Sequence, residues 1–131
     1  MQKSDTPLAR KARSILRGFH AASSAIQASA LVSDDGLMIA AVLSDEMDAD
    51  RFSAMCASLL ALATRAAEES QRGELRQLIL DGALGPMLLA RAGSVGVFAV
   101  AASSNANLGK VILDTRTTAK ALSELENLPD Y

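Results

Sequence analysis

The residues able to perform chemistry are few in this 131-residue sequence, and they lie far apart. His20 is the single histidine and has no carboxylate at helical spacing, so we expect a surface histidine rather than a general base or metal ligand. Cys56 is the single cysteine, which excludes an internal disulfide and a multi-thiolate metal site. It lies among apolar neighbours, and nothing close in sequence would lower its pKa, so we expect a buried and unreactive thiol.

Two acidic clusters have the composition of catalytic or metal-binding sites, but each has a structural explanation. Asp34 and Asp35 are adjacent, so on a strand their side chains would point to opposite faces, and a turn explains both. The acidic loop at residues 45–50 lacks the glycine and the distant bidentate glutamate of a calcium loop. Helix capping and solubility are therefore the expected roles of that loop.

Motifs that bind phosphate or nucleic acid are also missing. The sequence contains no GxxxxGK[ST] pattern, and its glycines between residues 82 and 96 fall in turns or a strand rather than between a strand and a helix. The formal net charge is −2, and no aromatic residues interleave with the basic side of the first helix, so we expect no nucleic-acid partner. We predict no catalytic residue, no cofactor and no metal, which favours an interaction module over an enzyme.

The sequence also indicates where in the cell the protein is expected to lie. No apolar stretch approaches the roughly 20 residues that a membrane helix needs. The first residues carry charge without the apolar run of a secretory signal. We therefore expect a cytoplasmic protein that does not insert into membranes, folded as one domain over residues 1–131.

Hydrophobic periodicity predicts a mixed α/β (α+β) fold with three helices and five strands. The segments Ile26–Ser33 and Leu37–Leu43 form a hairpin whose tight turn is Asp35-Gly36, because glycine accepts positive φ. Both segments are apolar without alternation, which is typical of strands covered on both faces of their sheet. The predicted elements are a helix beginning at Thr6 and fading from Gly18 to Ser24, the two hairpin strands, a helix at 49–71 capped by Asp48 or Asp50, strands at 75–81, 87–91 and 95–102, and a helix from Asn105 or Asn107 to about Leu125.

The second helix is unusual because residues 52–64 contain no charge. A surface helix needs a polar side along its whole length, and this one has almost none in its middle. One apolar side contains Phe52, Cys56 and Leu60, and a second side contains Met55, Ser58, Leu62 and Arg65, with Ala54 and Ala61 beside it. A single protomer cannot cover both sides, so we expect a dimer.

An ordered set of features resembles the roadblock/dynein light chain family, in particular its bacterial MglB-like branch. The features are the Asp35-Gly36 hairpin within ASALVSDDGLMIAAVL, the small-residue strand at 95–102, and NANLGK at residues 105–110 opening the last helix. The resemblance covers about residues 8–125. It implies a five-stranded antiparallel sheet of order 2-1-5-4-3, with the second helix on one face and the other two helices on the opposite face.

The resemblance also implies partners. Family members dimerise through the third strand and the second helix, and they act as non-catalytic scaffolds or regulators of small Ras-like GTPases. In the MglB-like branch, regulation works by remodelling the partner's own site. A single GTPase that covers the paired second helices would meet Arg51, Glu68 and Glu69 at their exposed ends, so we expect these residues to contact it. The implied dimer interface consists of Ala54, Met55, Ser58, Ala61, Leu62, Arg65, Leu75, Gln77 and Ile79.

Two other functions compete with a homodimeric GTPase regulator. One is a GTPase-independent adaptor within a multiprotein complex, which would not respond to the nucleotide state of any partner. The other is a small-molecule sensor, which needs a sizeable apolar cavity with a few convergent polar groups.

Overall fold

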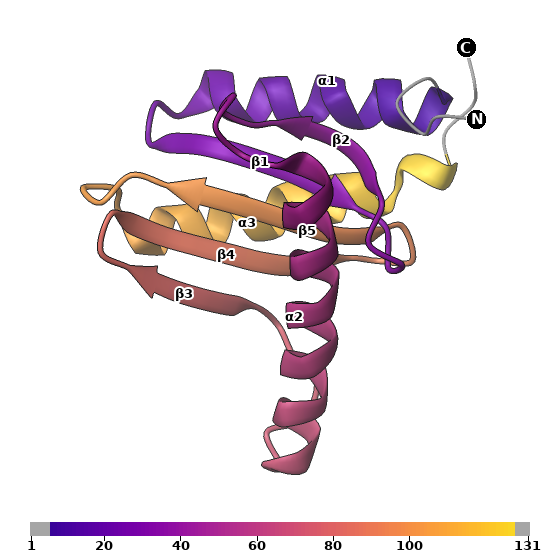
Figure 1. Ribbon diagram of the computed structural model, residues 1–131, viewed down its shortest axis with the longest axis vertical. Coiled ribbons are helices and arrows are strands. Elements are labelled where there is room, and N and C mark those ends of the chain that lie inside the picture. The colour runs from indigo at the N-terminus through magenta and orange to yellow at the C-terminus, as the bar shows by residue number, and fades with distance from the viewer. Residues whose placement is uncertain (1–5, 128–131) are drawn as a thin grey trace.

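The computed structural model describes residues 6–127 as one antiparallel sheet with helices on both faces (Figure 1). The strand order is β2-β1-β5-β4-β3, which confirms the predicted fold class and topology. Residues 1–5 and 128–131 of the predicted domain span lie outside the described residues. The elements are α1 (Pro7–Ala22), β1 (Ile26–Val32), β2 (Met38–Val42), α2 (Ala49–Glu69), β3 (Leu78–Gly82), β4 (Gly85–Ala92), β5 (Gly96–Ala102), α3 (Leu108–Ser123) and η2 (Leu125–Asn127).

Each face of the sheet has its own apolar core. Helices α1 and α3 cover one face, where Phe19 and Phe98 pack edge to face with ring centroids 5.5 Å apart. Helix α2 covers the other face, where Cys56 and Leu60 pack on Val97. Strands β1 and β5 contribute side chains to both cores, which explains why their sequences are apolar without alternation.

The helices begin at polar caps that satisfy free backbone N–H groups. Thr6, Asp48 and Asn107 each accept a hydrogen bond from the backbone N–H three residues later, at 3.0, 3.1 and 3.1 Å. Helix α1 ends at Ala22, within the predicted range of Gly18 to Ser24, and it passes through Gly18 without a break. Phe19, which lies in the core, holds this last turn against the sheet, and packing outweighs the poor helix propensity of glycine.

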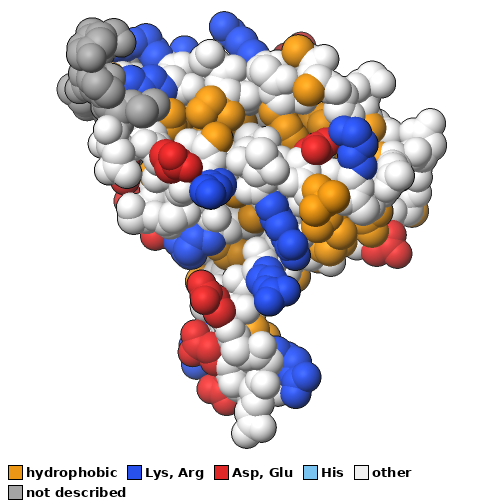
Figure 2. Space-filling model, turned by 180° about the vertical axis from the view of Figure 1, so that it is seen from behind, with side chains coloured by type: hydrophobic (Ala, Val, Ile, Leu, Met, Phe, Trp, Pro, Cys, Tyr) orange, Lys and Arg blue, Asp and Glu red, His pale blue; other side chains and the backbone are white. Residues whose placement is uncertain are grey.

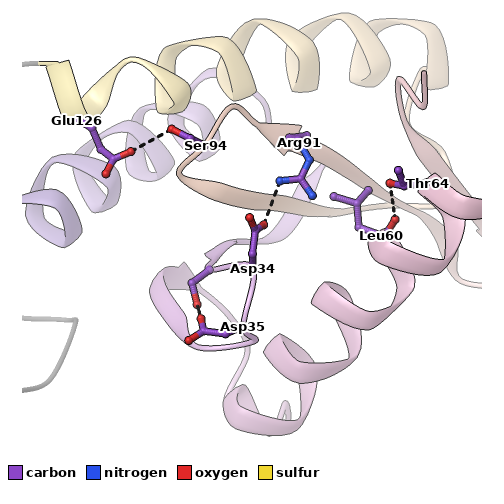
Figure 3. Close-up of polar contacts among 8 residues, drawn as sticks. Asp34, Asp35, Leu60, Thr64, Arg91, Ser94 and Glu126 are labelled. Atoms are coloured by element: carbon purple, nitrogen blue, oxygen red, sulfur yellow. Dashed lines mark hydrogen bonds and ion pairs between the residues drawn. The ribbon is translucent and has the colours of Figure 1, made fainter. Parts of the chain in front are cut away.

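The β1–β2 hairpin is closed by three residues rather than two. Ser33 N–H donates to the Leu37 carbonyl at 2.8 Å, which leaves Asp34, Asp35 and Gly36 in the loop. Gly36 has φ +88°, as the last position of such a loop requires. Figure 3 shows Asp34 reaching Arg91 on β4, 3.0 Å away, and Asp35 bonded to the Ser33 hydroxyl. Both carboxylates therefore serve the hairpin and its attachment to the sheet, in agreement with a turn.

The strands at the other edge of the sheet differ from the prediction. β3 begins at Leu78 rather than Leu75, so the chain between residues 72 and 77 is a connection from the end of α2. β4 is longer than predicted because its pairing with β3 continues to Gly82 opposite Gly85, leaving a two-residue turn. In β5, Gly96 has φ +154°, and a Cβ atom there would lie 2.0 Å from the Val32 carbonyl oxygen of β1.

Candidate functional site

Helix α2 buries one side and exposes the other. Its buried side consists of Ser53, Cys56 and Leu60, which face the sheet. On the opposite side, 51% of Met55 and 63% of Leu62 are exposed, which are high values for large apolar side chains in the middle of a helix. The second apolar side predicted from the sequence is therefore uncovered within one chain.

A shallow groove runs along this exposed side. Its volume is about 370 Å³, and its lining is almost entirely apolar. In Figure 1, α2 crosses the sheet and projects beyond β3, so the second half of the helix has little of its own chain beside it. The lining residues are Ala54, Met55, Ser58, Leu59 and Leu62.

Strand β3 extends the uncovered surface along the sheet edge. It pairs with β4 on one side only, so the backbone N–H and C=O groups of its other side have no strand partner among residues 6–127. Leu78 packs in the core under α2, and strand alternation places Leu80 on the same face. Ile79 and Leu80 are each 39% exposed. An open edge with apolar side chains is a surface on which another chain can pair.

The structure divides the predicted dimer interface between two faces of the sheet. Ala54, Met55, Ser58 and Leu62 line one groove, and Ala61 and Arg65 are exposed on the same helix. Leu75 lies before β3 and is half-buried in the core under α2.

Gln77 lies on the other face. Its side-chain amide donates to the Ile112 carbonyl of α3 at 3.4 Å, so it faces away from α2. Alternation places Ile79 on that face as well, beside the open edge. The sequence reasoning missed Leu80, which the two-residue period in LILDG would have grouped with Leu78.

The predicted GTPase-contact residues lie at both ends of α2. Arg51 is exposed in the first turn, and Glu68 and Glu69 are exposed in the last. These residues are therefore available to a partner, and their role stays a prediction.

A second, larger groove lies beside the last turns of α2. Its volume is about 1340 Å³, and it is open to solvent. Its walls carry Arg72, Arg76, Arg91 and Arg116 against Glu68 and Glu74. Figure 2 shows Lys and Arg side chains gathered over the middle of the α3 face, above the projecting end of α2. The charged and open lining is not that of an enclosed apolar cavity, so it gives no support to a small-molecule sensor.

The isolated chemical groups have structural roles. Cys56 is 1% exposed, which confirms the expected burial, and burial raises the pKa of its thiol to about 11. His20 is half-buried rather than fully exposed, and its Nε2 and the buried Ser29 hydroxyl share a hydrogen bond of 2.8 Å. Burial lowers the pKa of His20, so the neutral imidazole is favoured. Within residues 6–127, no group of His, Cys, Asp or Glu side chains is arranged to hold a metal ion.

Cys56 is expected to react with a disulfide reagent such as Ellman's reagent only after the fold opens. With a pKa of about 11, roughly one thiol in 3,000 is ionised at pH 7.5. Because the folded-state pKa lies above the ordinary 9.0, the contribution of this thiol to folding stability is constant below about pH 9 and falls as the pH rises toward 11. Labelling should be complete in denaturant and slow in buffer. Rapid stoichiometric labelling of the native protein at pH 7.5 would contradict the buried position.

None of the helices within residues 6–127 combines the length and the apolar character that a membrane crossing requires.

Comparisons with known proteins agree on the fold. Residues 16–102 match the Roadblock/LC7 domain family. The uncharacterized protein MJ1340 of Methanocaldococcus jannaschii is 31% identical over 100 residues, covering 76% of this chain and 87% of that protein. The structure of Myxococcus xanthus MglB superposes with a TM-score of 0.81 at 20% identity, covering 90% of this chain and 97% of that one. A structure described as MglB with tetrameric arrangement gives a TM-score of 0.78 at 18% identity, covering 92% and 90% of the two chains.

Proposed function

The chain belongs to the Roadblock/LC7 domain family, and we propose that it is a non-catalytic, cytoplasmic homodimer that binds a small Ras-like GTPase and modulates its nucleotide cycle. The likeness to MglB structures supports this branch of the family. The observation that carries the proposal is the uncovered apolar side of α2 beside the open edge of β3.

Self-association accounts for both uncovered features at once. A twofold axis brings the same surface of two copies together, so Met55 and Leu62 of one copy are covered by α2 of the other. The β3 edges lie beside the helices and can pair in the same contact. The tetrameric arrangement of one MglB structure supports association between copies of this fold.

Regulation of a GTPase by such a dimer follows from differential binding. A protein that contributes no catalytic group can change a GTPase only by binding its switch conformations with unequal affinity. A tenfold preference requires about 1.4 kcal/mol, which one or two well-placed contacts supply. Arg51, Glu68 and Glu69 lie at the exposed ends of α2. We expect a GTPase that straddles the twofold axis to contact these ends.

The dimer is expected to bind its GTPase at least tenfold more tightly in one nucleotide state than in the other. The test is a calorimetric titration with Ras-like GTPases encoded in the same genome, each loaded with a GTP analogue and separately with GDP. Equal affinity in the two states would identify a GTPase-independent adaptor. Failure of every such GTPase to bind in either state would remove the GTPase from the proposal and leave the other candidate functions.

A further inference from the structure

Charge is distributed unevenly between the two faces of the sheet. The whole sequence has a formal net charge of −2. Helix α1 nevertheless contains four basic residues and no acidic residue, and α3 contains three basic residues and one acidic residue. Together with Glu124 and Glu126, which follow α3, residues 7–22 and 108–127 carry seven basic and three acidic side chains, a net charge of +4. One face of an acidic protein is therefore basic.

Most of these basic side chains are accessible from outside. Lys110 pairs with Asp114 at 2.6 Å. Arg17, Arg116 and Lys120 have no ion-pair partner among residues 6–127, so their charges are available to a second molecule. We call the outer side of α1 and α3 the basic face, and its exposed basic residues are Arg10, Arg17, Lys110, Arg116 and Lys120.

The basic face is broad rather than deeply grooved. Helices α1 and α3 pack against each other on the same face of the sheet, and the hollow between them measures only about 310 Å³. Figure 2 looks onto this face and shows Lys and Arg side chains spread across it above the projecting end of α2. Leu113, which is 62% exposed, lies one helical turn from both Lys110 and Arg116. Such a surface fits an extended anionic layer better than a single peptide.

We propose that the basic face binds the surface of an anionic phospholipid bilayer without inserting a helix into it. The negative surface potential of such a bilayer attracts nearby Lys and Arg side chains, and each contributes about fivefold to the affinity. The apolar sides of α1 and α3 are already packed in the core of the protein. The contact is therefore mainly electrostatic, with Leu113 adding apolar area at the level of the lipid headgroups.

The self-association proposed above strengthens and orients this contact. If the α2 helices of two copies meet on one face and the β3 edges pair beside them, both basic faces lie together on the opposite side of the joined sheets. Two linked basic faces bind one bilayer more tightly than one does. The ends of α2 that are offered to the GTPase then point away from the lipid. This orientation rests on the proposed function, whereas the basic face belongs to each single chain.

The test is co-sedimentation with vesicles made of equal parts phosphatidylglycerol and phosphatidylcholine at low ionic strength. The original protein should bind these vesicles, should not bind vesicles of phosphatidylcholine alone, and should dissociate as salt is added. R17Q/K120Q removes one exposed charge from each helix of the basic face and should weaken binding about 25-fold.

R72Q/R91Q is the matched control, because it removes the same amount of charge from outside the basic face. Arg72 follows the end of α2, and Arg91 pairs with Asp34 on the side of the sheet that α2 covers, as Figure 3 shows. This variant should bind vesicles like the original protein. L62E, which is expected to be monomeric, should still bind but more weakly, because it keeps the basic face and loses only the second copy.

The outcomes separate the proposal from its alternatives. Weaker binding by R17Q/K120Q, with R72Q/R91Q unchanged, supports it. No binding by the original protein, equal binding to both kinds of vesicle, or equal losses in the two double variants overturns it. Binding to double-stranded DNA in place of vesicles also overturns it, by assigning the basic face to nucleic acid. A monomeric original protein that binds anionic vesicles overturns the self-association alone, so the two failures are distinguishable. Circular dichroism melts establish that each variant is folded.

Discussion

L62E is expected to convert the dimer into a folded monomer and to raise the dissociation constant about 1,000-fold. Leu62 lies at the centre of the exposed side of α2, and 63% of it is exposed in the single chain, so the change does not disturb the protomer core. In the dimer, each glutamate would be buried without a partner at about 2 kcal/mol apiece, and the two together correspond to about three orders of magnitude. Light scattering across a dilution series measures the change.

L113E is the matched control for that experiment. Leu113 is 62% exposed in the middle of α3, so it has the same size, exposure and helical setting as Leu62 but lies on the opposite face of the sheet. The control should remain dimeric. Dissociation of both variants would point to a non-specific effect of added charge, and an intact dimer in both would show that the α2 groove is not the interface.

G96A is expected to destabilise the fold by about 3–5 kcal/mol, a large part of the stability of a small domain. The added Cβ would lie 2.0 Å from the Val32 carbonyl oxygen and 3.1 Å from the Ser33 Cα atom, and φ of +154° is unfavourable for any side chain. β1 cannot move aside, because it is paired with β2 as well as β5 and is packed on both faces. Urea denaturation measures the loss.

Gly18 supplies the opposite control for this substitution. It is exposed within α1, and a Cβ atom there would meet nothing within 4 Å. G18A should therefore stabilise the protein by about 1 kcal/mol through helix propensity alone. If G96A melts like the original protein while G18A behaves as expected, the close approach of β5 to β1 at Gly96 is not real.

The fold was predictable wherever one local signal determined an element. Thr6 with Pro7 gave the start of α1, and the apolar runs of β1 and β5 indicated strands covered on both faces. The errors arose where distant contacts decide. Where α1 ends within the predicted range depends on the packing of Phe19 in the core, and β3 begins only where pairing with β4 starts at Leu78 opposite Leu89. Neither contact is visible in a local window of sequence.

The candidate surface was also predictable only in part. The exposed side of α2 followed from helical spacing, because Met55, Ser58 and Leu62 repeat at three and four residues. Gln77 was grouped with this side because it was assigned to the strand predicted at residues 75–81, whereas β3 begins at Leu78. Its bond to the Ile112 carbonyl joins residues that are 35 positions apart, and no periodicity reports such a contact.

The open edge of β3 makes the single protomer prone to aggregation. Sheets usually guard such an edge with lysines, prolines or bulges, yet β3 is LILDG, whose only charge is Asp81 near its end. While that edge is uncovered, it can pair in a wrong register or with any other exposed strand. In the proposed dimer this edge is covered, so variants that weaken the interface are expected to aggregate as well as dissociate.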